Sequence, residues 1–214
     1  MSGEAGRRPG PLYAIADVER IGAGRVVDAV AAMAEAGIGT IQLRAKGTSD
    51  RALEGLVEAS RRVLEGWDGT FWIDDRVDLA RLFGLDGVQL GQRDLRPAEA
   101  RPLLPRGCRI GASTHDSEQL RIADADPAVD WVALGPIFAT SSKTDPDPVV
   151  GLGAVRELRR RTAKPLVAIG GLGPDNLGDV LAAGADAVAL LSAICDGDVA
   201  ANCRRALAAV GANP

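Results

Sequence analysis

Aromatic residues are scarce in this chain: its 214 residues include only three Trp, three Phe and one Tyr. With 46% hydrophobic residues, the core must be built mainly from aliphatic side chains. Glycine is abundant by comparison, at 26 residues, well above the usual share of about 7%. This composition, with 25% charged residues, excludes a disordered or collagen-like chain and predicts a globular domain with many special backbone positions.

Cysteine and histidine are also rare, with three Cys and one His. Cys108, Cys195 and Cys203 are odd in number, and their spacing matches neither a CxxC pair nor a Cys/His zinc site. The sequence therefore gives no sign of a disulfide framework or a structural zinc site. We expect reduced cysteines in or near the core of a cytoplasmic protein.

Long runs of one charge or of hydrophobic residues are missing as well. The 25 Lys and Arg against 29 Asp and Glu give a net charge of −4, and the one basic run, at 159–161, is typical of a solvated helix end. The apolar stretch at 187–195 is far shorter than the roughly 18 residues of a membrane span. Residues 1–10 lack a signal-peptide core and predict a flexible tail. We therefore expect neither nucleic acid nor a membrane as a partner.

Eight short apolar runs rich in β-forming residues recur along the chain. Most are continuous, which is typical of parallel strands that are buried on both faces. They span residues 12–17, 40–46, 70–75, 87–91, 109–114, 131–137, 165–172 and 187–194. Helical periodicity separates them, most clearly over 26–34, 53–63 and 177–181, and more weakly over 76–83, 97–104 and 116–124.

Eight strand–helix repeats in about 200 residues predict a single-domain (β/α)8 TIM barrel over residues 11–214. An open doubly wound sheet is the alternative architecture, but no GxGxxG follows the first run. In such a barrel the active site forms at the carboxyl ends of the strands. Polar and glycine residues that end the apolar runs are therefore the candidate site residues.

Gln42, Arg44 and Lys46 alternate with apolar residues in the second run, so their side chains face the same side of the strand. Two cations and an amide at the mouth of a barrel suit a phosphate or diphosphate. The alternative interpretation is a buried Arg44 paired with a barrel carboxylate.

Three aspartates, Asp74, Asp75 and Asp94, follow the third and fourth runs. Carboxylate oxygens near a diphosphate favour Mg²⁺, which takes one or two carboxylates and fills its other positions with water and phosphate. Asp75 could instead cap the helix that follows it, and Asp94 the turn before Pro97. The residues alone leave the metal and capping interpretations open.

The last three strand ends predict a second anion site. The segment 140–143 carries three hydroxyls and a lysine, although an ordinary surface loop has the same composition. Gly170–Gly171 allows close approach of the backbone to a ligand. The N–H groups after Leu191–Ser192 open a short helix, and barrels often bind phosphate at this pair of loops.

Seven ordered motifs resemble the thiamine-phosphate synthase (thiamine-phosphate pyrophosphorylase) family, which also includes thiazole tautomerase, and the similarity runs from about Leu12 to Ala209. They are QLRAK, the Asp-Asp-Arg of FWIDDR, GVQLGQRDL, GASTH, GPIFATSSK, VAIGGL and LLSAI. The resemblance implies a Mg²⁺-dependent transferase of EC 2.5.1 type. It would condense 4-amino-5-hydroxymethyl-2-methylpyrimidine diphosphate with hydroxyethylthiazole phosphate to give thiamine phosphate and diphosphate.

The resemblance also implies a role for each site residue. Catalysis would involve Arg44, Lys46, Ser113 and Lys143. The pyrimidine diphosphate would contact Gln42, Arg44, Lys46, Asp74, Ser113 and Lys143. The thiazole phosphate would contact Thr140, Ser141, Ser142, Gly171, Leu191 and Ser192. Mg²⁺ would bind Asp75 and Asp94.

Three residues depart from the family pattern: Asp74 stands in place of Asn, Ser142 in place of Thr, and Gln89 in place of His. Asp74 adds negative charge beside a diphosphate unless a nearby cation neutralises that charge. Gln89 is more like the tautomerase branch, whereas the cations and carboxylates assigned above fit diphosphate and Mg²⁺ chemistry.

Two alternative functions follow from these departures. One is a thiazole tautomerase-like isomerase that uses His115 for proton transfer, and the other is a non-catalytic binder of thiazole or thiamine phosphate. His115 follows the fifth run, where it could act as a general acid and base, but we favour a hydrogen-bonding role in its loop. The preferred thiazole phosphate and the oligomeric state, homo-oligomers included, stay open.

Overall fold

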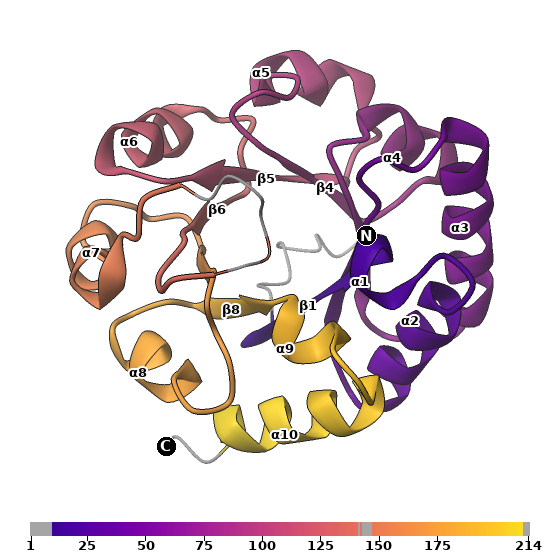
Figure 1. Cartoon of the computed structure of the whole chain (residues 1–214). Coiled ribbons are helices and arrows are strands. Elements are labelled where there is room, and N and C mark those ends of the chain that lie inside the picture. The colour runs from indigo at the N-terminus through magenta and orange to yellow at the C-terminus, as the bar shows by residue number, and fades with distance from the viewer. Residues whose placement is uncertain (1–9, 141, 143–146, 212–214) are drawn as a thin grey trace.

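The eight strands form a closed parallel barrel in the order β1-β2-β3-β4-β5-β6-β7-β8, as a computed structural model shows (Figure 1). The structure describes residues 10–140, 142 and 147–211. The strands are β1 (Leu12–Asp17), β2 (Thr40–Arg44), β3 (Thr70–Asp74), β4 (Gly87–Leu90), β5 (Arg109–Thr114), β6 (Trp131–Leu134), β7 (Leu166–Ile169) and β8 (Ala187–Leu190). The predicted (β/α)8 barrel is therefore confirmed, while the predicted tail lies outside the described residues except for Gly10.

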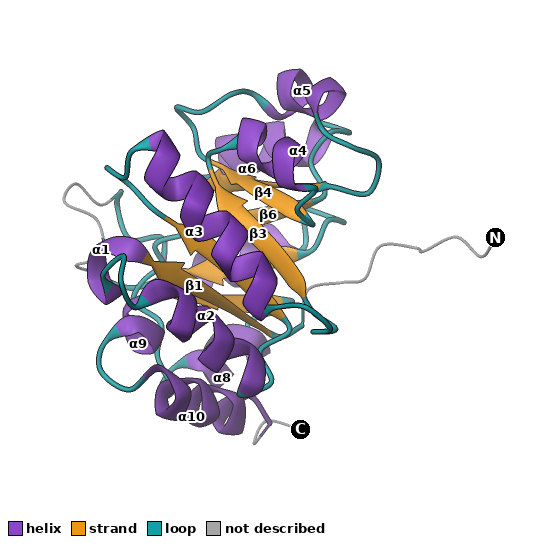
Figure 2. Ribbon diagram, turned by 90° about the vertical axis from the view of Figure 1, so that its right-hand side faces the viewer, coloured by secondary structure: helices purple, strands orange, loops and turns teal. Residues whose placement is uncertain are grey.

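Helices follow the strands along the chain, and most of them lie on the outside of the barrel (Figure 2). They are α1 (Val18–Ile21), α2 (Val26–Glu35), α3 (Asp50–Val63), α4 (Val77–Phe83), α5 (Pro97–Ala100), the 3₁₀ helix η1 (Arg101–Leu103), α6 (Ser117–Ala125), α7 (Gly151–Arg159), α8 (Leu177–Ala182), α9 (Ser192–Cys195) and α10 (Val199–Gly211). Among the described residues, none of these helices combines the length and apolarity needed to cross a membrane. The three cysteines are free and buried, as predicted.

Boundaries were the weaker part of the prediction. The runs ending at 137, 172 and 194 extend past the ends of β6, β7 and β8 into loops and α9. Apolar character alone cannot separate a buried strand from a loop packed over its end. Helices α1 and α10 were not predicted, and Val63, placed on the buried face of α3, is 43% exposed.

The basic run at 159–161 does mark a helix end, since α7 ends at Arg159. Arg159 is not simply solvated, however. Its guanidinium pairs with Asp186 and donates a hydrogen bond to the carbonyl of Lys164 at 3.0 Å. It therefore ties the end of α7 to the loop before β8.

The described residues form two apolar clusters, because successive strand residues face opposite sides of the sheet. The larger cluster lies between the strands and the helices and includes Leu12, Ala14 and Ala16 of β1. The smaller one lies inside the barrel and includes Tyr13 and Ile15 of the same strand. Packed side chains thus fill the barrel interior below the opening at the carboxyl ends of the strands.

Three of the seven aromatic side chains gather inside the barrel: Tyr13, Trp72 and Trp131. Trp72 and Trp131 stack with ring centroids 3.9 Å apart at 9°, and Tyr13 lies 5.4 Å from Trp131. Glycines on neighbouring strands make room for them. A Cβ on Gly87 would lie 2.5 Å from the Trp72 ring, and one on Gly111 would lie 2.1 Å from Trp131 Nε1. Part of the glycine excess therefore accommodates the few large rings.

We expect Gly87→Ala to destabilise the protein by about 1–3 kcal/mol, because the added methyl group overpacks the Trp72 ring. Gly55→Ala in α3 is the matched control, because Gly55 is exposed and its Cβ would meet no atom within 4 Å. That change should be neutral or stabilising. Urea unfolding measures both, and equal stability of the two variants would contradict this packing.

Candidate active site

Three side chains of β2 and its exit converge on Asp74 at the end of β3. Gln42 Nε2 donates to Asp74 Oδ1 at 3.0 Å. Arg44 Nε and Lys46 Nζ lie 3.6 and 3.5 Å from Asp74 Oδ2. The expected alternation along this strand therefore places an amide and two cations on one side, around a single carboxylate.

Arg44 also has a second, more deeply buried partner. Its Nη1 pairs with the carboxylate of Asp17, which ends β1 and is 1% exposed. Burial alone would lower the pKa of Arg44, but Asp17 and Asp74 outweigh it and raise that pKa. The alternative interpretation, a buried arginine paired with a barrel carboxylate, thus describes one end of this guanidinium. Its remaining N–H groups can still donate to an anion.

Lys46 links this group to Asp75, whose carboxylate it contacts directly. Asp75 has φ of 63°, a left-handed conformation that few non-glycine residues adopt. It does not cap α4, because the N-cap position is Arg76 and no side-chain capping bond forms there. The strained backbone instead directs Asp75 toward Lys46, and such strain is concentrated at functional sites.

Asp94 closes its own turn, since its Oδ2 accepts a hydrogen bond from the Gly91 N–H at 2.7 Å. It does not cap α5, whose N-cap position is Arg96. The capping interpretation therefore holds for one oxygen of Asp94, and the same carboxyl group also lies beside that of Asp75.

Negative charge is in excess at this site. Burial raises the pKa of Asp74, and the negative charge of Asp75 adds to this increase. The positive charges of Lys46 and Arg44 oppose it, and the resulting pKa of Asp74 is about 6. Burial also raises the pKa of Asp75, Lys46 lowers it, and the neighbouring carboxyl of Asp94 adds to the increase.

A divalent cation between Asp75 and Asp94 would relieve the repulsion between these carboxylates, so the pair fits Mg²⁺. Within the described part of the chain no cluster of three or more metal-binding side chains occurs. Mg²⁺ would thus need water or phosphate to complete its coordination.

Two buried glutamines lie beneath these groups, each bonded to an aromatic donor. Tyr13 OH donates to Gln42 Oε1, and burial raises the pKa of Tyr13, so that its hydroxyl keeps the proton. Trp131 Nε1 donates to Gln89 Oε1 at 3.0 Å, and Gln89 Nε2 donates to Ser113 Oγ at 3.0 Å. Tyr13 and Trp131 were not predicted as site residues, because their bonds depend on the register between strands.

The glycine pair Gly170–Gly171 has a structural role in addition to the expected approach to a ligand, which stays a prediction. Both residues have positive φ, at 97° and 67°. A Cβ on Gly170 would lie 2.6 Å from Pro136 Cα, and one on Gly171 would lie 2.6 Å from the Ala139 carbonyl oxygen. In this structure the backbone that approaches so closely is the loop after β6. The two glycines therefore position the loop after β6.

The second predicted anion site is described in part. Thr140 Oγ1 accepts a hydrogen bond from the Ser142 N–H at 3.2 Å. The predicted short helix is present, since α9 begins at Ser192 with Leu191 at its N-cap position. Ser141 and Lys143 lie outside the described residues.

His115 is held in a loop network. Its Nδ1 lies 2.5 Å from the Gly135 carbonyl oxygen, which can only accept, so Nδ1 carries a proton. Its Nε2 lies 3.4 Å from Asp147 Oδ2. These contacts support the favoured hydrogen-bonding interpretation.

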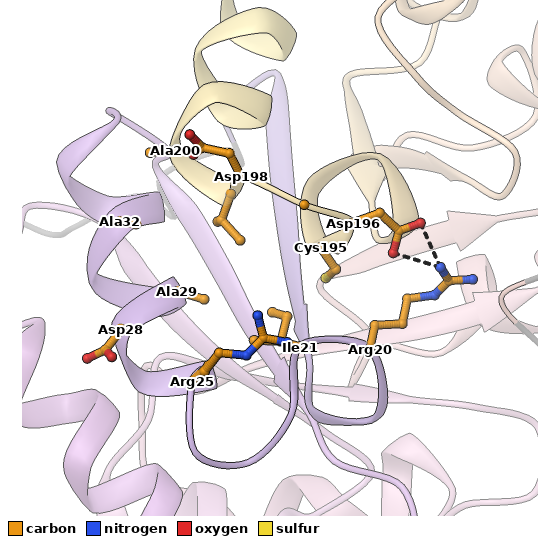
Figure 3. Close-up of a pocket in the computed structure, with 12 residues that line it drawn as sticks. Arg20, Ile21, Arg25, Asp28, Ala29, Ala32, Cys195, Asp196, Asp198 and Ala200 are labelled. Carbon is orange, nitrogen blue, oxygen red and sulfur yellow. Dashed lines mark hydrogen bonds and ion pairs between the residues drawn. The ribbon is translucent and has the colours of Figure 1, made fainter.

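A separate pocket of about 510 Å³ lies between the loop before α2 and the loop before α10 (Figure 3). Arg20 Nη1 lies 2.8 Å from each carboxylate oxygen of Asp196 at its edge. None of the predicted site residues that the structure describes lines it. The convergence of charges at the strand ends therefore remains the stronger candidate site.

Comparisons with known proteins show the family to which the chain belongs. The family model described as thiamine monophosphate synthase matches residues 12–194. The thiamine-phosphate synthase of Methanoculleus marisnigri is 44% identical over 195 residues, which cover 90% of this chain and 92% of that protein. The thiamine-phosphate synthase of Koribacter versatilis is 42% identical and covers 85% and 87%. The solved thiamine phosphate pyrophosphorylase from Pyrococcus furiosus has a TM-score of 0.85 at 30% identity, covering 95% and 96% of the two chains.

Proposed function

Because the chain belongs to the thiamine monophosphate synthase family, we propose that it condenses the two substrates named above, the pyrimidine diphosphate and the thiazole phosphate. One observation carries the proposal: Gln42, Arg44 and Lys46 converge on Asp74 beside the Asp75 and Asp94 carboxylates. Cations next to paired carboxylates suit a diphosphate that leaves together with Mg²⁺.

In the proposed reaction the thiazole nitrogen forms a bond to the pyrimidine methylene carbon, and the bond from that carbon to the diphosphate oxygen breaks. The diphosphate leaves with the electron pair. Arg44 and Lys46 would stabilise its developing charge, and Gln42 would orient the pyrimidine. Bound at Asp75 and Asp94, Mg²⁺ would supply further neutralisation of the diphosphate.

The thiazole phosphate would bind on the other side of the mouth, at the loops after β6, β7 and β8. Thr140, Ser142 and Ser192 offer hydroxyls there, and the Gly170–Gly171 pair sets the position of the first loop. Leu191 at the start of α9, and Ser141 and Lys143 outside the described residues, belong to the same proposal. Two separated anion sites allow both substrates to bind together.

Asp74 does not conflict with this function, although the family pattern has Asn there. Its Oδ1 accepts from the Gln42 amide, and its Oδ2 lies near both Arg44 and Lys46. Arg44 and Lys46 therefore offset part of the added negative charge, while burial and Asp75 still raise the pKa of Asp74 to about 6. This partial neutralisation favours a working synthase over a binder whose metal site Asp74 has spoiled.

The test is to incubate the purified chain with both substrates and Mg²⁺ and to identify the products. We expect thiamine phosphate and diphosphate in equal amounts, and neither product when one substrate is left out. Metal-independent isomerisation of a carboxythiazole phosphate, abolished by His115→Ala, would instead assign the isomerase function. Tight binding of thiamine phosphate with no turnover would assign the non-catalytic one.

A further inference from the structure

The register of three adjacent strands places Gln89 of β4, Gly111 of β5 and Trp131 of β6 at one level of the barrel. Gln89 is 6% exposed and Trp131 is 1% exposed. Their side chains meet across the intervening strand, with Trp131 Nε1 and Gln89 Oε1 3.0 Å apart. A Cβ on Gly111 would lie 2.1 Å from both atoms, so this bond requires glycine there.

The bond fixes which way the Gln89 amide faces. An indole N–H can only donate, so it selects the oxygen of Gln89 as its partner. The amide nitrogen is then left to face Ser113, and Gln89 Nε2 lies 3.0 Å from Ser113 Oγ. Ser113 lies two residues beyond Gly111, on the same face of β5 and nearer the mouth.

A serine hydroxyl that accepts a hydrogen bond from Gln89 must direct its own proton elsewhere. We propose that Trp131 is a positioning residue that acts through Gln89, so that Ser113 donates its hydroxyl proton to the anionic diphosphate of the substrate at the mouth. The proposal rests on the proposed function, because that function supplies the anion. Trp131 itself does not touch the substrate.

Trp72 provides a matched control within the same ring stack. It is as buried as Trp131, at 0% exposure, and its ring lies 3.9 Å from that of Trp131. Its Nε1 instead donates to Thr70 Oγ1 at 3.2 Å, at the amino end of β3 and away from the mouth. Each Trp→Phe change removes one indole N–H, and the two changes remove a similar amount of packing. Only Trp131→Phe breaks the hydrogen-bond connection to Ser113.

The experiment measures steady-state diphosphate release against pyrimidine diphosphate concentration. We expect Trp131→Phe to raise KM for this substrate about five- to tenfold, as loss of one oriented hydrogen bond would. Trp72→Phe should keep KM within about twofold of the wild type. In a Ser113→Ala background, Trp131→Phe should have no further effect on KM, because the two residues act in one chain of hydrogen bonds.

Equal effects of the two Trp variants on KM, or a Trp131→Phe effect that persists in Ser113→Ala, would show that Trp131 acts through packing and would overturn the proposal. A wild-type chain that releases no diphosphate contradicts the proposed function instead. Calorimetric titration with inorganic diphosphate and Mg²⁺ then tests the role of Trp131 independently of turnover. Weaker binding in Trp131→Phe than in Trp72→Phe supports it, and equal binding or no binding overturns it.

Discussion

Asp94→Asn is expected to reduce kcat/KM for diphosphate release at least about a hundredfold and to raise the Mg²⁺ concentration needed for activity. The substitution separates the two interpretations of Asp94. An Asn oxygen can still accept the Gly91 N–H bond that Asp94 Oδ2 accepts now, so the turn is kept. Only the negative charge that would bind Mg²⁺ is lost. The measurement is a titration of activity against Mg²⁺ for the wild type and the variant.

Two controls accompany the Asp94 experiment. Asp94→Ala removes both the charge and the turn bond, so it should be no more active than Asp94→Asn but less stable. EDTA should abolish wild-type activity, and excess Mg²⁺ should restore it. An Asp94→Asn variant with wild-type activity, or full wild-type activity in EDTA, would show that Asp94 only closes a turn.

Arg44→Gln is expected to lower diphosphate release about a hundredfold or more, because the group proposed to stabilise the leaving diphosphate is lost. The same change should also destabilise the fold by about 3–5 kcal/mol, since Asp17 is left buried without its cationic partner and keeps the hydrogen bond from the Arg20 N–H. Loss of activity in this variant alone therefore has two explanations. Assays below the unfolding temperature, together with urea unfolding, measure the two effects.

The double variant Asp17→Asn/Arg44→Gln separates them. It removes both charges of the buried pair, so stability should return toward that of the wild type. Activity should stay low if Arg44 contacts the diphosphate. Activity that recovers together with stability would show that Arg44 is a structural partner of Asp17, the alternative left open by the sequence.

The barrel could be predicted because strands buried on both faces have continuous apolar sequences. The ends of these strands could not, since the loop at 135–137 and helix α9 are equally apolar where they cover the mouth. The alternation of Gln42, Arg44 and Lys46 correctly placed three side chains together, because it depends on one strand alone.

Contacts between side chains of different strands could not be predicted from the sequence. The pairing of Arg44 with Asp17 joins residues 27 positions apart, and the bond from Trp131 to Gln89 spans 42 positions. Both depend on barrel register, which no local pattern encodes. For the same reason the excess of glycine could be noticed in the sequence but not explained. Gly111 is needed because two side chains from neighbouring strands meet over it.

A crystal structure with thiamine phosphate, inorganic diphosphate and Mg²⁺ tests the proposed site most directly. We expect diphosphate beside Arg44 and Lys46, with Mg²⁺ on Asp75 and Asp94. We expect the phosphate of thiamine phosphate at the loop that begins α9, near Ser192. Diphosphate bound instead in the pocket lined by Arg20 and Arg25, with the strand ends empty, would contradict this assignment.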